Sequence, residues 1–330
     1  MEKTKLTRRE LLAGSAALLA ASAVMPAWAQ QSYPSRPVRM LVGFPAGGSA
    51  DSVARLVGEK FSSALGQQFV VENKPGASGN IATLDVLNAP ADGQTVYLTQ
   101  LNLATNPSIM DVGYDPLTAL RMVSQFISVP VVMLTNPKSG LKTVSDVVAL
   151  AKTKNGELKF GGVLGTSSHL CAEILAIDQD FKFKLVPYKG GALAVQALMS
   201  EEVDVVFDLM SGTLKGLLDA GELHAAAVMQ DTPVAGLEGV VPAGDQGVTT
   251  PAFFRSWMGL SVRAGTPEDI VATLHKASSE ALADPGLRSS LEALGAEIRP
   301  SASPDEFQQF YLSELQRFGD LIRTIGYQPE

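Results

Sequence analysis

Two short turns rich in glycine and hydroxyl side chains are the part of this sequence with the clearest chemical use. The first is 45–51 (PAGGSAD) and the second is 165–169 (GTSSH). Each turn follows a short apolar run typical of a strand and precedes a stretch typical of a helix. Such a strand–turn–helix unit presents free backbone N–H groups, short hydroxyls and the positive end of a helix to one point in space. Each turn therefore predicts an anion site, and together they predict a small carboxylate held between two lobes.

The elements that must position these turns alternate along the chain. The strand-like runs are 38–44, 68–72, 95–99, 131–135, 159–163, 184–187, 203–207, 224–229 and 258–262. The helix-like runs are 52–65, 80–88, 144–154, 170–177, 192–200, 214–220, 267–283, 287–294 and 304–325. Alternation of this kind predicts an α/β protein with parallel, doubly wound sheets, whose binding sites lie at the carboxyl ends of the strands.

Two irregular segments indicate where the chain passes between lobes. Residues 102–130 contain three prolines, and residues 230–250 are rich in glycine, proline and aspartate. A self-contained α/β run that holds the second anion turn lies between them. We therefore predict lobe 1 from residues 30–124 and 231–330 and lobe 2 from residues 125–230, joined by a hinge that closes around a ligand.

The first 29 residues have the composition of a secretory signal peptide. A basic start is followed by a small, apolar stretch at 11–25 and by the cleavage motif AWA, which ends at Ala29. The apolar stretch is shorter than the roughly 20 residues that a spanning helix needs. Arg8 and Arg9 resemble a twin-arginine signal, but paired arginines also occur in ordinary secretory signals, so both export routes stay open. We expect residues 1–29 to be cleaved near Ala29 and the mature protein to work in the periplasm.

The charge of the mature chain narrows its partners. Without the signal peptide the chain keeps 22 basic and 32 acidic residues, a net charge of −10. An acidic surface argues against nucleic acid and against anionic membrane surfaces. It also means that local dipoles, rather than the overall field, must hold a carboxylate. The only cysteine, Cys171, excludes an internal disulfide, so the core must be stable unaided.

Seven segments along the mature chain carry a family resemblance. They are 32–38 (SYPSRPV), 44–51 (FPAGGSAD), 71–81 (VENKPGASGNI), 167–170 (SSHL), 186–190 (VPYKG), 203–208 (VDVVFD) and 291–296 (LEALGA). In this order they resemble the Bug receptors, the periplasmic binding proteins of tripartite tricarboxylate transporters. The resemblance implies a fold like that of type II periplasmic binding proteins, with two lobes, a hinge and a ligand cleft. It also implies a non-catalytic receptor for a small carboxylate, such as a dicarboxylate or an aromatic carboxylate, that delivers its ligand to membrane components of the transporter.

Departures from the usual family pattern concern the ligand. Leu164 lies in a less polar approach to the second turn, and Leu209 and Met210 follow Asp208 where an asparagine is common. We expect these residues to make the cleft wall more apolar, which favours a hydrocarbon or aromatic ligand body over citrate. Asp245 stands where a glutamate is usual.

The sequence and the resemblance together give a set of candidate ligand-binding residues. They are Phe44, Ala46, Gly47, Gly48, Ser49, Asn80, Gln100, Thr166, Ser167, Ser168, His169, Tyr188 and Asp208. Each also has a structural explanation, because glycines permit tight turns and hydroxyls cap helices. Asp208, at a strand end, is suited either to receive an amino or hydroxyl group or to cap a helix. Asp51, in a first helical turn, is interpreted as complementing the helix dipole.

Other classes of function have weaker support. The sequence has no G-x-S-x-G elbow, and its three histidines form no H-E-x-x-H motif, so an exported hydrolase is the less favoured alternative. A receptor for sulfate, phosphate or a metal complex stays open. We expect no catalytic residue, no metal and no cofactor, and we expect a monomer.

Overall fold

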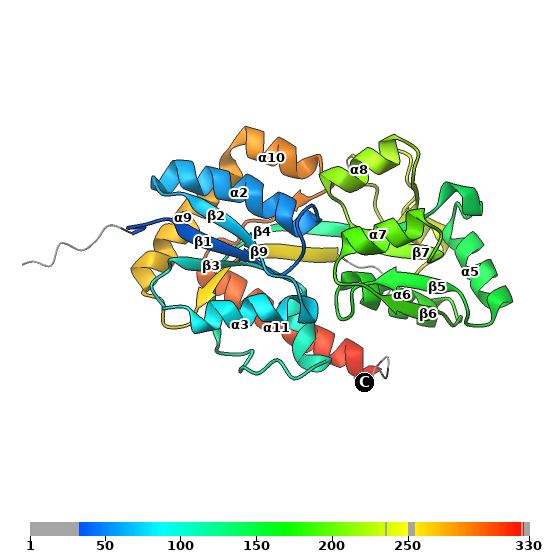
Figure 1. The fold of residues 1–330 in the computed structure, drawn as a ribbon, viewed down its shortest axis with the longest axis horizontal. Coiled ribbons are helices and arrows are strands. Elements are labelled where there is room, and N and C mark those ends of the chain that lie inside the picture. The colour runs from blue at the N-terminus through cyan, green and yellow to red at the C-terminus, as the bar shows by residue number, and fades with distance from the viewer. Residues whose placement is uncertain (1–32, 235, 250–254, 325, 327–330) are drawn as a thin grey trace, which may run out of the picture.

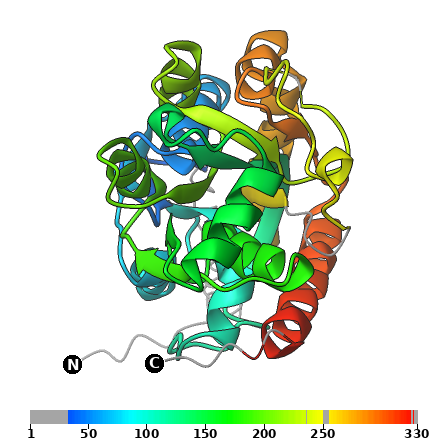
Figure 2. The same ribbon diagram turned by 90° about the vertical axis from the view of Figure 1, so that its right-hand side faces the viewer.

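The chain folds into two α/β lobes placed side by side along the long axis of the molecule (Figure 1). The computed structural model describes residues 33–234, 236–249, 255–324 and 326, and the predicted signal peptide lies outside these residues. In the view along the long axis, lobe 2 lies in front of lobe 1 and α11, in red, runs down one side (Figure 2). None of the described helices is long and apolar enough to span a bilayer.

Lobe 1 is built on a mixed sheet with the strand order β2-β1-β3-β9-β4. Its strands are β1 (Val38–Val42), β2 (Phe69–Asn73), β3 (Thr95–Gln100), β9 (Arg255–Arg263), the first part of β4 (Leu120–Thr135) and the short β10 (Glu297–Ile298). Its main helices are α2 (Ser49–Leu65), α3 (Asn80–Asn88), α9 (Glu268–Ala283), α10 (Pro285–Glu292) and α11 (Pro304–Thr324). β1 is parallel to β2 and β3, whereas β9 is antiparallel to β3 and β4.

Lobe 2 continues the sheet from the second part of β4. Its other strands are β5 (Lys159–Gly162), β6 (Lys184–Pro187), β7 (Val205–Leu209) and β8 (His224–Val228). Its helices are α5 (Val144–Lys154), α6 (Ser167–Asp178), α7 (Gly191–Met199) and α8 (Gly212–Asp219). β5 is parallel to β6 and β7, and β4 is antiparallel to β7 and β8. The shorter helical segments of the chain are η2 (Ala77–Gly79), α4 (Asn102–Thr105), η3 (Asn106–Ser108), η4 (Pro137–Ser139) and η5 (Gly244–Gln246).

The long strand β4 corrects two expectations from the sequence. Residues 102–130 were expected to be irregular, but β4 begins at Leu120 and runs through Pro130 into lobe 2. Its residues 120–130 pair with β9, and its residues 131–135 pair with β7 and β8. Proline lacks the N–H that a ladder needs, and here it lies where the strand changes partners. The expectation of parallel sheets is also wrong for this part of the fold, because β4 runs antiparallel to β7, β8, β9 and β10. The lobe boundaries at 124/125 and 230/231 stay a prediction.

Buried apolar side chains fill both faces of this sheet. In lobe 1, Phe61 is fully buried and packs edge-on against Phe69 and Phe126. In lobe 2, Phe160 stacks on Phe207 with ring centroids 5.6 Å apart. Cys171 of α6 is also completely buried, and desolvation raises the pKa of its thiol well above the ordinary value. Such packing of large side chains provides the main stabilisation of a core without disulfides.

Three helices outside the cleft begin with a side-chain cap. Thr143 and Asp146 form a capping box at α5, with the Asp146 N–H donating to the Thr143 hydroxyl over 3.1 Å. The Ser211 hydroxyl accepts from an N–H of α8, and the Asp284 carboxylate accepts from one of α10. Each cap satisfies an N–H group that the first helical turn leaves without a partner.

Candidate functional site

Three helices that lack such a cap begin at one pocket between the lobes. The N-cap residues of α2, α6 and α7 are Gly48, Thr166 and Gly190, and none of the three makes a side-chain capping hydrogen bond. These helix N-termini lie at the pocket, where first-turn N–H groups lack the carbonyl partners of a helix interior, and the Leu193 N–H of α7 donates to the Gly190 carbonyl over 3.1 Å. About 640 Å³ of space free of protein atoms lies between these residues, open solvent included, and the cavity itself measures about 70 Å³. It is lined by Phe44, Pro45, Gly48, Ser49, Ala50, Gln100, Leu101, Asn102, Val163, Thr166, Ser167, Ser168, Gly190, Gly191, Ala192, Asp208, Leu209 and Ser256.

The turn before α2 offers donors on one side of the pocket. Gly47 takes a positive φ of 85°, which glycine adopts without strain, and its N–H donates to Asp51 Oδ2 over 3.0 Å. Burial raises the pKa of Asp51, but hydrogen bonds from Arg55, Gly47 and Asn73 outweigh it and hold the pKa below its ordinary value. Asp51 therefore stays ionised and structural. The hydroxyl of Ser49 makes no hydrogen bond to any other described residue.

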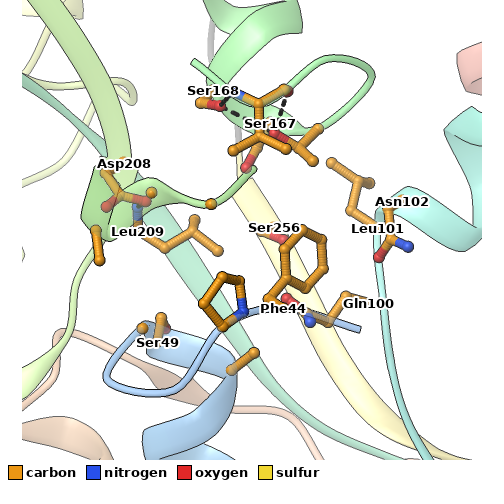
Figure 3. Close-up of a pocket in the computed structure, with 18 residues that line it drawn as sticks. Phe44, Ser49, Gln100, Leu101, Asn102, Ser167, Ser168, Asp208, Leu209 and Ser256 are labelled. Carbon is orange, nitrogen blue, oxygen red and sulfur yellow. Dashed lines mark hydrogen bonds between the residues drawn. The ribbon is translucent and has the colours of Figure 1, made fainter. Parts of the chain in front are cut away.

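The turn before α6 offers donors on the opposite side (Figure 3). The Thr166 hydroxyl donates to the Val163 carbonyl over 2.7 Å, and the Val163 N–H donates to the Ser168 hydroxyl over 2.9 Å. Through these hydrogen bonds, the Thr166 and Ser168 hydroxyls stabilise the turn itself. Among the described residues, nothing is hydrogen-bonded to the hydroxyl of Ser167, so it and the first N–H groups of α6 are available to a ligand.

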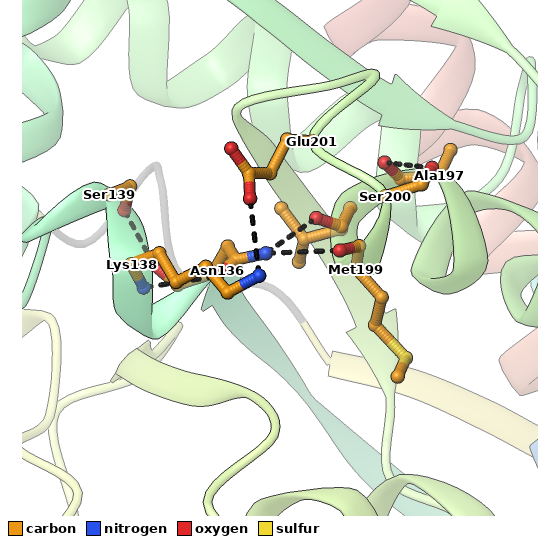
Figure 4. Close-up of polar contacts among 8 residues, drawn as sticks. Asn136, Lys138, Ser139, Ala197, Met199, Ser200 and Glu201 are labelled. Atoms are coloured by element: carbon orange, nitrogen blue, oxygen red, sulfur yellow. Dashed lines mark hydrogen bonds and ion pairs between the residues drawn. The ribbon is translucent and has the colours of Figure 1, made fainter.

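A third glycine turn, before α7, completes the donor set. Gly190 and Gly191 follow β6 in the same strand–glycine–helix pattern as the other two turns, but our list of candidates did not include them. At the far end of α7, the amide of Asn136 donates to the carbonyls of Leu198 and Met199, each over 3.2 Å (Figure 4). The C-terminus of α7 is thus tied down within lobe 2, while its N-terminus stays open to the pocket.

Asp208 is the only ionisable side chain among the lining residues. It is half-buried, and its Oδ1 accepts from the N–H of Leu209 over 2.8 Å. Its carboxylate packs on Gly191, where an added Cβ would lie 2.5 Å from both oxygens. Burial raises the pKa of Asp208 to about 6. The described residues that line the pocket therefore include one carboxyl group, which protonates close to neutral pH, and no cationic side chain.

The structure brings eight of the candidate residues to this pocket. They are Phe44, Gly48, Ser49, Gln100, Thr166, Ser167, Ser168 and Asp208. The other five candidates, Ala46, Gly47, Asn80, His169 and Tyr188, do not line it.

The contacts of these five explain their positions. Ala46 and Gly47 are exposed, and the Gly47 carbonyl accepts from the Thr213 hydroxyl of α8 over 3.5 Å. The Asn80 amide donates to the Val112 carbonyl over 3.1 Å, and Tyr188 packs against Gly161. The fully buried His169 accepts from the Gly165 N–H at Nδ1 and lies 3.4 Å from Glu173 at Nε2, so it braces the second turn from behind.

The apolar wall differs from the expectation. Of Leu164, Leu209 and Met210, only Leu209 lines the pocket, while Met210 is buried in the core. Leu101, Val163 and Phe44 supply the rest of the apolar surface together with Pro45.

Two polar lining residues were also missed. Asn102 follows β3, and Ser256 lies on β9. The placement of Ser256 depends on the antiparallel pairing of β9 with β3 and β4, which no local pattern indicates.

The chemistry of this arrangement is binding. Neutral donors from both lobes surround a space of metabolite size, and the lining contains no cysteine, lysine or histidine that would serve as a nucleophile or base. Within the part of the chain that the structure describes, no three His, Cys, Asp or Glu side chains form a group that could hold a metal ion.

The two lobes and the cleft between them define a solute-binding protein of the periplasmic type. Residues 53–327 match the sequence model of the family described as the tripartite tricarboxylate transporter family receptor, TctC. The protein BugT of Bordetella pertussis is 31% identical over 96% of this chain and 97% of its own. The chain therefore belongs to the TctC or Bug family of periplasmic, non-catalytic receptors.

Solved structures agree with this assignment. The Rpa4515 protein of R. palustris with adipate has a TM-score of 0.86 and 30% identity, over 90% of this chain and all of that chain. MatC (Rpa3494) from Rhodopseudomonas palustris with bound malate has a TM-score of 0.80 and 29% identity, over 88% of this chain and all of that chain. Both similarities extend over the two lobes, which makes the α/β periplasmic binding protein fold that of this chain.

Proposed function

We propose that this receptor captures a small carboxylate with a hydrocarbon or aromatic body and delivers it to the membrane components of a tripartite tricarboxylate-type transporter. Capture between the lobes closes the hinge, and the closed monomer is the form that the membrane partner recognises. The observation that carries the proposal is the meeting of three uncapped helix N-termini at a pocket without a cation.

Neutral donors are sufficient to hold a carboxylate in this setting. The first-turn N–H groups of α2 and α6 point into one pocket, and the free hydroxyls of Ser49 and Ser167 stand beside them. A hydrogen bond to a charged group contributes about 1.5–3 kcal/mol, and a helix N-terminus adds favourable field at its end. Several such bonds provide micromolar affinity without a lysine or arginine.

The apolar wall of the pocket favours a ligand with a hydrocarbon or aromatic body. Phe44, Leu101, Val163 and Leu209 line the pocket between the polar turns, so the middle of the ligand meets hydrocarbon rather than donors. Citrate would place further carboxylates against this wall and against Asp208, which offers no positive charge. The adipate and malate held by the two structural relatives support a small carboxylate of this size.

A ligand screen tests the proposal. Thermal shift of the purified mature protein is measured with adipate, malate, benzoate, citrate, amino acids, sulfate and phosphate, and any ligand carried through purification is identified by mass spectrometry. We expect stabilisation by adipate or benzoate and little by citrate. Stabilisation by citrate alone would overturn the apolar-body proposal, and stabilisation by sulfate or phosphate but by no carboxylate would favour the other anion class.

Removal of the free hydroxyls tests the donor set. Ser49→Ala and Ser167→Ala should each weaken binding of the stabilising carboxylate about ten- to a hundredfold in calorimetry, because each loses one bond to a charged group. Ser290→Ala is the matched control, since its hydroxyl donates to the Gly286 carbonyl within α10. Unchanged affinity in both cleft variants would show that these hydroxyls take no part in binding.

A further inference from the structure

Four residues outside the pocket join the two lobes directly behind the second anion turn. In lobe 1, Ser78 lies in η2 and Thr105 ends α4. In lobe 2, Leu164 and Gly165 immediately precede the N-cap of α6. The Ser78 hydroxyl donates to the Leu164 carbonyl, and the Thr105 hydroxyl donates to the Gly165 carbonyl. We call these two hydrogen bonds the interlobe latch.

The lobe 1 side of the latch is held in place before it reaches across. Ser78 has a left-handed backbone, with φ 49°. Its carbonyl accepts the amides of both Asn102 and Asn106, over 2.8 and 3.0 Å. Thr105 and Asn106 are completely or almost completely buried. A non-glycine residue in this conformation needs such fixed surroundings, so the position of the Ser78 hydroxyl is set by lobe 1 alone.

The lobe 2 side is equally constrained. Gly165 has a φ of 72°, and its N–H donates to His169 Nδ1 over 3.2 Å. An added Cβ on Gly165 would lie 1.8 Å from Ile109 Cδ1 of lobe 1, so the two lobes meet here in direct contact. The latch therefore fastens the backbone of the turn whose next residues, Thr166 and Ser167, line the pocket.

We propose that Ser78 and Thr105 are positioning residues that fix the N-terminus of α6 in its binding orientation only when the lobes are closed. Neither residue lines the pocket, and both act through the carbonyls of Leu164 and Gly165. Opening the hinge separates the lobes and breaks both bonds, so closure and alignment of the donors are one event. The inference rests on the proposed function, because the aligned donors are those offered to the carboxylate.

Asn102 connects the latch to the pocket itself. Its side chain lines the pocket while its amide donates to the Ser78 carbonyl. A ligand that contacts the Asn102 side chain therefore contacts a hydrogen-bond partner of Ser78. This contact gives lobe 1 a route by which occupancy favours the latch.

The test combines the distance between lobes with the lifetime of the complex. Spin labels replace the exposed Glu59 of α2 and Leu193 of α7, and the buried Cys171 stays unlabelled. Double electron–electron resonance is recorded without ligand and with adipate in the mature protein and in Ser78→Ala, Thr105→Val and Thr105→Ser. Dissociation of adipate is followed by stopped flow in the same proteins.

The expected pattern separates a latch from a merely structural role. With adipate bound, the parent protein should show a short, closed distance that Ser78→Ala and Thr105→Val populate less, and adipate should leave both variants about ten times faster. Thr105→Ser keeps the hydroxyl and should behave like the parent protein, and so should the remote control Ser290→Ala. If Thr105→Val fails to fold, the half-buried Ser78→Ala decides the outcome.

Failure of the latch differs from failure of the proposed function. Absence of the short distance from the adipate-bound parent protein, or an equally populated short distance with unchanged adipate dissociation in Ser78→Ala, would overturn the latch. If no carboxylate in the screen binds the parent protein, the proposed function fails, and the ligand that mass spectrometry identifies replaces adipate in the test of the latch.

Discussion

The helices of this molecule begin in two different ways. α5, α8 and α10 begin with Thr143, Ser211 and Asp284, whose side chains satisfy N–H groups of the first turn. α2, α6 and α7 begin at the cleft with Gly48, Thr166 and Gly190, and no side chain caps them. The sets differ in where the first-turn N–H groups find their partners.

This difference indicates how an acidic protein retains an anion. A capped helix uses its donors for its own stability, whereas an uncapped one leaves them for a ligand. Even the hydroxyl residues at the second cleft turn follow this division, because Thr166 and Ser168 bond to each other and to Val163 rather than to helical N–H groups beyond the turn. Under the proposed function, affinity comes from donors left free in the folded state.

The largest difference between uncapped and capped helices should appear when one N–H group is removed at the N-terminus of each. Ser167→Pro removes an amide and a hydroxyl at the first position of α6, where proline fits a helix and Thr166 already has an extended backbone. We expect more than about a hundredfold loss of affinity in calorimetry, since two bonds to the ligand disappear. Gly212→Pro at the same position of the capped α8 is the control, because a Cβ there meets no atom within 4 Å. Equal effects of the two substitutions would end the distinction.

A smaller effect comes from the one carboxyl group beside the uncapped helices. With the pKa of Asp208 raised to about 6, its ionised form opposes a bound carboxylate at pH 7. If binding requires the protonated form, affinity should rise about tenfold from pH 7 to pH 5. Asp208→Asn should bind equally at both pH values, while Asp245→Asn keeps the pH dependence. If affinity instead decreases as the pH is lowered from 7 to 5, the ionised Asp208 accepts a hydrogen bond from a hydroxyl or amino group of the ligand.

Asp208 should also make the free energy of unfolding depend on pH, in the direction opposite to that of a salt-bridged aspartate. Its folded-state pKa lies above the ordinary value, so its favourable contribution is complete below about pH 4 and is lost as the pH rises through 6. Asp208→Asn should therefore melt higher than the parent protein at pH 7 and no higher at pH 4.

The smallest expected effects lie at the capped helices. Thr143→Ala and Ser211→Ala should each lower the free energy of unfolding by about 1 kcal/mol, because each leaves one N–H group without its cap. Thermal melts should fall by a few degrees, while carboxylate affinity stays unchanged. A loss of affinity in either variant would mean that caps outside the cleft also shape the site.

Local signals were sufficient to predict much of the fold and part of the site. Glycine next to hydroxyl residues after an apolar run is a local pattern, and it placed a helix after each turn, although α2 begins at Ser49 rather than at 52 and α6 begins at Ser167 rather than at 170. The same pattern at Gly190 and Gly191 was present in the sequence, and a consistent search for strand–glycine–helix units would have included it. Most other predicted strands and helices differ from the observed ones by a few residues at their ends, whereas β4 begins at Leu120 rather than at 131.

Non-local pairing explains what the sequence did not reveal. Ser256 reaches the pocket because β9 crosses back between β3 and β4, and this register depends on residues more than a hundred positions apart. The N–H of Gly47 is already bonded to Asp51, which a pattern of residue types cannot indicate. Which N–H and hydroxyl donors remain free depends on the acceptors that the folded chain places next to them.

The position of β9 between β3 and β4 affects the order in which the chain can fold. β1, β2 and β3 connect to β4 only through β9, which is made after all of lobe 2. The N-terminal third of the chain therefore cannot complete its sheet while the remainder is still emerging. Pairing over such long separations is slow and leaves strand edges exposed in the meantime. The newly made receptor thus stays incompletely folded until nearly its full length is available.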